Sequence, residues 1–260
     1  MSHNPVAPSP RALGRRPAAT LAHGEVTHIA RTPVDVDLAA EQWRSYAAAL
    51  ADAGFEIIEV PADDSFADSV FVEDAVVVLG RVAVLTSPGA VSRRGEIAGV
   101  EAVVAGLGLV ERRIDLPGTL DGGDVLKIGD TVYVGRGGRT NAEGIRQLTA
   151  IAADEGFEVV AVPVTRVLHL KSAVTALPDG TVIGHAPLVE HPELFERFLD
   201  VPEETGSAVV VLAPDAVLMA ASAPLTAALF AGLGYRVVTV DISEFEKLEG
   251  CVTCLSVRIR

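Results

Sequence analysis

Acidic residues, one histidine and one cysteine interrupt segments that otherwise have the apolar, β-branched composition of buried strands. These side chains are Asp68, Glu73, Asp74, Asp121, Asp124, His169 and Cys254. A buried strand needs none of them, and burying several carboxylates is costly unless a cation or hydrogen-bond donors oppose the charge. A pocket that collects these groups is therefore suited to a positively charged ligand with several N–H donors.

Each of these residues also has an explanation that involves no chemistry. Glu73 and Asp74 could be the charged side chains of an edge strand, where charge prevents the strand from pairing with another molecule. Asp121 fits the first position of an Asp-Gly-Gly turn. His169 lies between apolar neighbours in VLHLKSAV and fits a histidine of the core. From the residues alone these alternatives stay open.

The two cysteines of the chain both lie in the motif Cys251-Val-Thr-Cys254. Two thiols are too few for a disulfide framework or a four-cysteine zinc site. A CxxC motif can form a redox pair, but such a pair usually opens a helix, whereas this one precedes the strand-like LSVRIR. No group of histidines has metal-ligand spacing and no phosphate-binding glycine loop is present, so we expect neither a metal nor an organic cofactor.

Two arginines lie just before predicted helices, Arg93 in SRRGE and Arg139 in GGRTNAEG. An arginine is unfavourable beside the positive N-terminal end of a helix unless an anion binds there. Both positions therefore indicate a site for an anionic group, although a solvated helix end is the simpler alternative.

A short β-branched run that ends in proline or aspartate recurs along the chain. The five copies are EIIEVP (56–61), ERRIDLP (111–117), EVVAVP (158–163), RFLDVP (197–202) and RVVTVD (236–241). A second strand-like segment follows each copy, and four of these segments continue through a tight turn, such as Gly129-Asp130, into a third strand. The pattern predicts five units of about forty to fifty residues, the last one cut short.

Helical periodicity recurs between the strands. The predicted helices cover residues 37–54, 96–108, 145–156, 188–199 and 225–234. Thr140 and Glu143 form a capping box before the third helix, and Pro224 starts the last. Strands that come in hairpins disfavour a doubly wound sheet, and repeated units of this kind usually close into a ring. We predict an α/β ring in a single domain over residues 14–260, preceded by a frayed segment at residues 1–13.

Charge and hydropathy exclude several classes of partner. Lys and Arg number 21 against 35 Asp and Glu, which gives a formal net charge of −14. Nucleic acids and anionic membranes attract clustered basic residues, so we expect neither as a partner. The uncharged run 216–235 has spanning length, but Pro224 and its terminal glycines predict a strand, a turn and a helix. The N-terminus lacks the apolar core of a secretion signal, and we expect a cytoplasmic protein.

The combination of motifs resembles the dimethylarginine dimethylaminohydrolase (dimethylargininase) family of the guanidine-modifying superfamily. The resemblance extends over nearly the whole chain after about residue 50. It rests on DSVFVED (68–74), SRRGE (92–96), LDGGDVL (120–126), RTNAEG (139–144), LHLKS (168–172) and GCVTCLS (250–256). It implies a pseudo-symmetric α/β propeller of five ββαβ units around a central active site, which agrees with the number of repeats.

The resemblance also implies a role for each residue. Cys254 resembles the nucleophile, His169 the general acid and base, and Asp121 the residue that orients His169. The positions that resemble substrate contacts are Asp68, Glu73 and Asp74 for the guanidinium and amino groups, Arg93 and Arg139 for the α-carboxylate, the backbone of Leu248, and Glu25 beside Gly24 in a lid. The implied reaction is hydrolysis of Nω-methylated arginine to citrulline and methylamine or dimethylamine through a covalent thiouronium, without a cofactor.

Other functions fit parts of the same pattern. The pocket chemistry would also serve an arginine deiminase or another guanidine hydrolase of the superfamily, since only the space for the leaving group differs. Outside this group, the alternatives are a non-catalytic binder of cationic ligands and a CxxC thiol protein. We expect a small-molecule substrate as the partner, and the sequence leaves a homodimer open.

Overall fold

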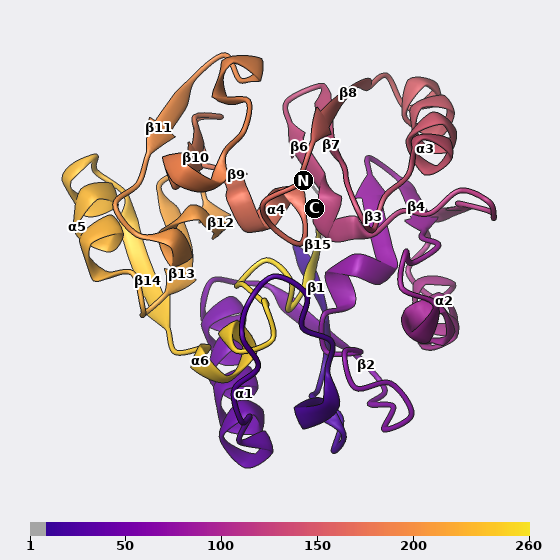
Figure 1. Cartoon of the computed structure of the whole chain (residues 1–260), viewed down its shortest axis with the longest axis horizontal. Helices are drawn as coiled ribbons and strands as arrows, with labels where there is room; N and C mark the ends of the chain where they lie inside the picture. Colours follow the sequence, from indigo (N-terminus) through magenta and orange to yellow (C-terminus); the bar gives the residue numbers. More distant parts are fainter. Residues whose placement is uncertain (1–8) are drawn as a thin grey trace, which may run out of the picture.

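All strands of residues 9–260, the part of the chain that the computed structural model describes, belong to five three-stranded sheets (Figure 1). Four sheets are each made from three consecutive strands. These are β3 (Val76–Leu79), β4 (Val82–Leu85) and β5 (Val110–Arg113); β6 (Val125–Ile128), β7 (Thr131–Arg136) and β8 (Glu158–Pro163); β9 (Val174–Ala176), β10 (Val182–Gly184) and β11 (Phe198–Asp200); and β12 (Val209–Ala213), β13 (Ala216–Ala220) and β14 (Arg236–Val240). The fifth sheet contains β15 (Val257–Ile259), β1 (Arg11–Arg15) and β2 (Glu56–Val60).

Every sheet has the same topology. Its first two strands pair antiparallel, and its third strand pairs parallel with the second. A parallel pair requires a crossover, and a helix provides it in four units. These helices are α1 (Val36–Asp52), α2 (Ile97–Val104), α3 (Ala142–Asp154) and α5 (Pro224–Gly232). The mixed α/β fold of five ββαβ-like units is confirmed.

Shorter helical segments occupy the connections. Two are single α-helical turns, α4 (Leu170–Ala173) and α6 (Ser243–Glu246). The others are 3-10 helices, η1 (Leu21–His23), η2 (Val72–Ala75), η3 (Val91–Glu96), η4 (Gly122–Asp124), η5 (Ala186–Leu188), η6 (Pro192–Leu194) and η7 (Glu204–Ser207). Four of them, η2, η4, α4 and η7, lie directly before the first strand of a sheet.

The fifth sheet joins the first and last described strands. β1 pairs antiparallel with β15, with Leu13 opposite Val257, and parallel with β2. Figure 1 shows β1 and β15 side by side near the middle of the molecule. The prediction that residues 1–13 are frayed is therefore wrong for residues 11–13; residues 1–8 lie outside the described part. The last unit is likewise not cut short, because β1 and β2 complete it.

Two local predictions are also wrong. Residues 188–199, predicted as a helix, instead contain η6 and most of β11. Pro192 lies at the start of η6, because it has no N–H to donate to a carbonyl of a preceding helical turn. The N-cap of α3 is Asn141, whose side chain accepts from the Gly144 N–H. Thr140 instead donates its hydroxyl to Asp124 at 2.6 Å, which takes it out of the predicted capping box.

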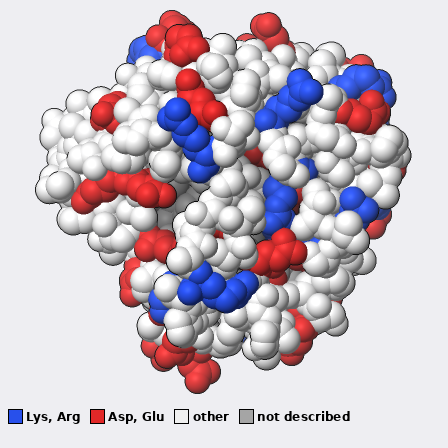
Figure 2. Space-filling view, in the orientation of Figure 1, with Lys and Arg blue, Asp and Glu red and all other residues white. Residues whose placement is uncertain are grey.

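The core consists of apolar layers where the sheets meet the helices and one another. The largest layer packs Trp43, Tyr46 and Leu50 of α1 against Leu218 of β13 and neighbouring strands. Residues 216–235 form a strand, a turn and α5, as predicted. Among the helices of residues 9–260, none combines the length and the apolarity that crossing a bilayer requires. On the face drawn in Figure 2, acidic and basic side chains are interspersed, without a large continuous basic area.

Leu13 tests the packing of β1 in the fifth sheet. Its side chain is fully buried in an apolar cluster that includes Val60, Ile97 and Val257. Leu13→Ala removes this packing and leaves a cavity, so we expect the free energy of unfolding to fall by about 2–5 kcal/mol in urea titrations.

Leu225→Ala is the matched control, because Leu225 is 63% exposed, and we expect it to leave the unfolding midpoint almost unchanged. Equal midpoints for Leu13→Ala and the wild-type protein would show that the β1 segment is not part of the folded core.

Candidate active site

A small pocket collects most of the candidate residues. Its lining comprises Glu25, Asp68, Phe71, Asp74, Arg93, Arg139, Leu168, His169, Leu248, Glu249, Gly250 and Cys254. Four different units contribute to it. Asp74 precedes β3, His169 precedes β9 and Cys254 precedes β15, whereas Arg93, Arg139 and Glu25 lie in the β4–β5, β7–β8 and β1–β2 connections. Asp74, His169 and Cys254, which come from three different units, therefore share one pocket.

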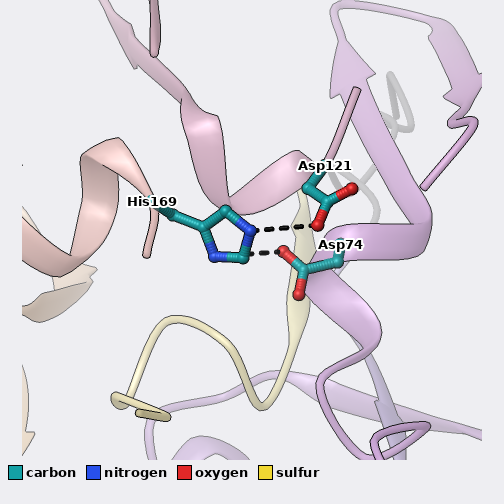
Figure 3. Close-up of side chains that lie close together, drawn as sticks. All are labelled: Asp74, Asp121 and His169. Carbon is teal, nitrogen blue, oxygen red and sulfur yellow. Dashed lines mark hydrogen bonds and ion pairs between the residues drawn. The ribbon is translucent and has the colours of Figure 1, made fainter. Parts of the chain in front are cut away.

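His169 is fixed by Asp121 (Figure 3). The His169 Nε2 lies 3.0 Å from Asp121 Oδ2, and the Gly89 N–H donates to the other Asp121 oxygen at 2.8 Å. The second ring nitrogen lies 3.9 Å from Asp74 Oδ1. Burial disfavours the charged ring, but Asp74, Asp121 and Asp124 outweigh it and raise the pKa of His169 to about 9. The ring is therefore protonated at neutral pH and can donate a proton.

Asp74 is held as an anion between cationic and N–H partners. Arg93 Nη1 donates to Asp74 Oδ2 at 2.7 Å, and the Gly123 N–H donates to Asp74 Oδ1 at 2.8 Å. Burial acts to raise the pKa of Asp74, but His169 and Arg93 lower it to about 2. A Cβ at position 123 would lie 2.7 Å from both Asp74 and His169, so the second glycine of LDGGD leaves the space in which the two side chains meet.

Arg93 lines the pocket, but most of its donors bind the protein. Besides Asp74, its guanidinium donates to both Glu96 oxygens at 3.0 and 2.9 Å and to the backbone oxygens of Asp68 and Phe71. In the described structure it therefore connects η2 to η3. The sequence analysis did not identify Glu96 as a partner of Arg93. Its position three residues after Arg93 in SRRGE is the sequence signal for this ion pair.

The segment predicted as a lid contributes Glu25 to the wall of the pocket. Its backbone N–H donates to the carboxylate of Asp68, at 3.0 Å to the nearer oxygen. Its side chain accepts from Ser92 and pairs with Arg139 at 2.9 Å. A Cβ on Gly24 would lie 2.6 Å from Asp68, which explains a glycine at this close approach. Arg139, a candidate for binding a substrate carboxylate, thus binds the carboxylate of the lid.

Asp68 is a pocket carboxylate whose charge is only partly opposed. Burial raises its pKa against the lowering effects of Arg93 and the Glu25 N–H. A cation that enters the pocket would find in Asp68 an acceptor with few cationic partners of its own.

Glu73 does not line this pocket. Its carboxylate lies 2.6 Å from Lys171 Nζ and 3.2 Å from an Arg258 nitrogen, and it accepts from the Thr253 hydroxyl at 2.8 Å. These four residues line a separate cavity of about 430 Å³. Because the Glu73 N–H also donates to the Cys254 carbonyl, Glu73 holds the loop that carries the cysteine in place. Lys171, Thr253 and Arg258 had not been singled out in the sequence.

Asp124 also lies behind the pocket. It accepts from Thr140 and, at 2.9 Å, from the Leu170 N–H, the residue after His169. Burial raises the pKa of Asp124 to about 6, although His169 and Thr140 act in the opposite direction. Its role is to hold the backbone that carries His169.

Cys254 is 6% exposed and lies beside the second cysteine. Its Sγ is 3.3 Å from Cys251 Sγ and 3.4 Å from the Cys251 nitrogen. The hydrogen bond to Cys251, burial and the negative charges of Glu73 and Asp74 all raise the pKa of the Cys254 thiol. Leu248 and Glu249 complete the wall beside it, and Glu249 has a positive φ of 60°, which marks a tight turn in the segment before the cysteines.

Asp74, Asp121 and His169 are close enough to hold a metal ion, since their ligand atoms lie within 4.8 Å of one another. However, the Asp74 oxygens accept from Arg93 and Gly123, and the Asp121 oxygens interact with Gly89 and His169. The donor set is thus bound to protein groups, as suits a proton-transfer pair rather than a metal centre.

Comparison with known proteins identifies the family, although no family model matches the chain. A dimethylarginine dimethylaminohydrolase from Streptomyces coelicolor is 64% identical over 253 residues, which cover 97% of this chain and 98% of the relative. The chain belongs to the dimethylarginine dimethylaminohydrolase family.

A dimethylarginine dimethylaminohydrolase from Pseudomonas aeruginosa is 40% identical over 251 residues, covering 95% of this chain and 98% of that protein. A solved structure of the Pseudomonas aeruginosa protein, a cysteine-to-serine variant with citrulline, superimposes with a TM-score of 0.89 at 37% identity and covers 96% of this chain and 98% of that one. The α/β fold with five units is thus the fold of the dimethylarginine dimethylaminohydrolases.

Asp121→Asn tests the origin of the His169 charge. The change removes one carboxylate charge beside the ring, so the pKa of His169 falls from about 9 toward its ordinary 6.5. The ring protons of His169, followed by NMR during a pH titration, measure the shift. Asp115→Asn removes an exposed carboxylate and is the control, which we expect to leave the titration of His169 in place. An unchanged titration in Asp121→Asn would contradict the assignment.

The same shift sets the direction of a stability change. The folded protein holds the His169 proton more tightly than the unfolded chain does, so the charged ring stabilises the fold fully below about pH 6.5 and loses this effect as the pH rises through about 9.

Proposed function

We propose that this chain hydrolyses Nω-methylated arginine to citrulline and methylamine or dimethylamine, with Cys254 as the nucleophile. The observation that carries the proposal is a protonated His169, fixed at 3.0 Å by Asp121, that lines the same pocket as Cys254. The family relationship supports a methylated arginine as the substrate, because both relatives are named for dimethylarginine. The citrulline in the related structure from Pseudomonas aeruginosa corresponds to the expected product.

The guanidinium group binds through carboxylates. Asp68 and Asp74 line the pocket, and carboxylates match the planar array of N–H donors of a guanidinium. This contact holds the guanidinium carbon, which resonance makes a poor electrophile, in place for attack. A positive ligand also offsets the excess of buried negative charge around Asp68.

The amino-acid end of the substrate binds at the lid. Arg139 is proposed to bind the α-carboxylate, and Glu25, 2.9 Å from Arg139, the α-amino group. The carbonyl of Leu248 is a further acceptor on the same wall. Arg93 is within reach of the same end, although its present bonds make its first effect the alignment of Asp74.

The chemical steps follow from the two titratable groups. The Cys254 thiolate attacks the guanidinium carbon and forms a tetrahedral adduct. His169 transfers its proton to the methylated nitrogen, the C–N bond breaks, and the amine leaves behind a thiouronium. The neutral His169 then takes a proton from water, whose oxygen attacks the same carbon. The C–S bond breaks, the hydroxyl proton of the adduct passes to solvent as the C=O bond forms, and citrulline and the Cys254 thiolate are released.

The substrate itself changes the charge state of the nucleophile. In the free protein, the hydrogen bond to Cys251, burial and the nearby carboxylates raise the pKa of Cys254 and keep the thiol protonated. A bound guanidinium reverses the sign of the local charge and favours the thiolate. Because the nucleophile must be a free thiol, we also propose a reducing compartment, the cytoplasm.

Replacement of the two cysteines tests the nucleophile. We expect Cys254→Ser to lower citrulline formation from dimethylarginine by at least about a thousandfold, and Cys251→Ser to retain most of it. Colorimetric detection of citrulline measures both. The same assay with arginine and agmatine separates the proposed function from an arginine deiminase: turnover of arginine above that of dimethylarginine would transfer the proposal to that enzyme. Reversed effects of the two serine variants would reassign the nucleophile to Cys251.

A thiolate titration tests the coupling between ligand and nucleophile. Thiolate absorbance in the ultraviolet, recorded against pH for Cys251→Ser, reports Cys254 alone. We expect an unreactive guanidine ligand to lower the apparent pKa, because its positive charge stabilises the anion. The Cys251→Ser, Cys254→Ser double variant gives the background. A titration curve that the guanidine does not move would contradict the mechanism.

A further inference from the structure

We propose that Cys251 is a site of reversible oxidation, at which a hydroperoxide converts Cys251 and Cys254 into an intramolecular disulfide. The effect of this disulfide on turnover rests on the proposed function of Cys254, whereas the disulfide itself does not. Cys251 forms no bond to the substrate in the hydrolysis described above, and its hydrogen bond to Cys254 does not by itself require a second thiol at this position.

The geometry of the loop brings the two sulfurs together. Cys251 and Cys254 are the ends of a turn in which the Cys254 N–H donates to the Cys251 carbonyl at 3.1 Å. Their sulfur atoms are 3.3 Å apart. The ends of such a turn lie within about 7 Å of each other at Cα, which is compatible with a disulfide. Rotation of the two side chains is therefore enough to form the bond.

The two thiols face different spaces. Cys254 lines the substrate pocket together with His169. Cys251 lines another cavity of about 320 Å³, whose wall also includes Arg166, Leu168, Ser207 and Ile242. Cys251 is partly exposed, whereas Cys254 is buried. A small oxidant can thus reach the pair through Cys251 without passing through the substrate pocket.

The pKa values of the two thiols also indicate that Cys251 reacts before Cys254. The hydrogen bond from the Cys254 thiol, outweighing burial, lowers the pKa of Cys251 to about 7, while Cys254 keeps its proton. A thiolate is the form that reacts with peroxide. Cys251 is consequently the first sulfur to be oxidised.

The chemistry balances with a hydroperoxide as the oxidant. The Cys251 thiolate attacks one peroxide oxygen, the O–O bond breaks, and the sulfur becomes a sulfenic acid as hydroxide, or an alkoxide, leaves. The Cys254 sulfur then attacks the sulfenic sulfur, the S–O bond breaks, and the Cys254 proton leaves with the hydroxide as water. The two sulfurs lose two electrons, which the peroxide gains. Reduction by a dithiol reverses the change.

Mass spectrometry of the oxidised full-length protein tests the proposal directly. The protein is treated with hydrogen peroxide, free thiols are alkylated under denaturing conditions, and trypsin then releases residues 248–258, which contain both cysteines. We expect this peptide to lose the mass of two hydrogen atoms and to take up no alkylating reagent. Turnover of dimethylarginine should be lost in parallel and return with dithiothreitol.

Cys251→Ser is the matched control. Without a second sulfur, oxidised Cys254 should gain oxygen as a sulfinic acid, and dithiothreitol should not restore turnover. Cys251→Ala provides a second variant if the serine perturbs the loop. A wild-type peptide that gains oxygen or remains open to alkylation would overturn the proposal. The peptide mass decides this even if the chain does not act on dimethylarginine.

Discussion

Buried Arg93 supplies the positive charge that opposes the carboxylates beside the pocket. Its guanidinium donates to Asp74, Glu96 and two backbone carbonyls, so that three buried charged groups oppose one another. Such a cluster is tolerable only if each charge is opposed and each donor is used. Asp74 thereby stays an anion, and this anion in turn raises the pKa of His169. The protonated state of His169 thus depends on an arginine that does not touch it.

A second layer of contacts fixes where His169 and Cys254 lie. Asp121 and Asp124 hold the ring and the backbone of the His169 segment. Glu73, tied to Thr253, Lys171 and Arg258, supports the segment of Cys254 from the separate cavity. Each acid of the repeats thus serves one of two purposes: it either lines the pocket or supports a residue that does. The support is what keeps the sulfur and the imidazole in the same pocket although they come from distant parts of the chain.

Much of this arrangement could be predicted from the sequence because it follows from local chemistry. The β-branched runs, the glycine turns and the helices give the five units, and the acids, His169 and Cys254 stand at matching places in them. The direction of each side chain could not be predicted. Glu73 and Asp74 are adjacent on a 3-10 turn, where consecutive side chains diverge, so Asp74 lines the pocket and Glu73 the separate cavity.

Contacts between residues far apart in the sequence could not be predicted either. β1 has only five residues and is recognisable as a strand only once β2 and β15 lie on either side of it. Thr140 looked like a helix cap because its partner Asp124, 16 residues away, is unknown until the fold brings them together. The burial of Arg15 could not be predicted either, because it lies in a polar segment. Its guanidinium donates to backbone oxygens of Pro61 and Glu96, which only the fold brings close.

The pairing of β1 with β15 has a consequence for the order in which the protein acquires its shape. During synthesis, β1 is made before the other described strands, and its partner β15 follows all of them. The segment of Cys254 lies directly before β15, so the pocket stays incomplete until β15 has been made. Four sheets can assemble beforehand from neighbouring strands, but the pocket is complete only once β15 pairs with β1.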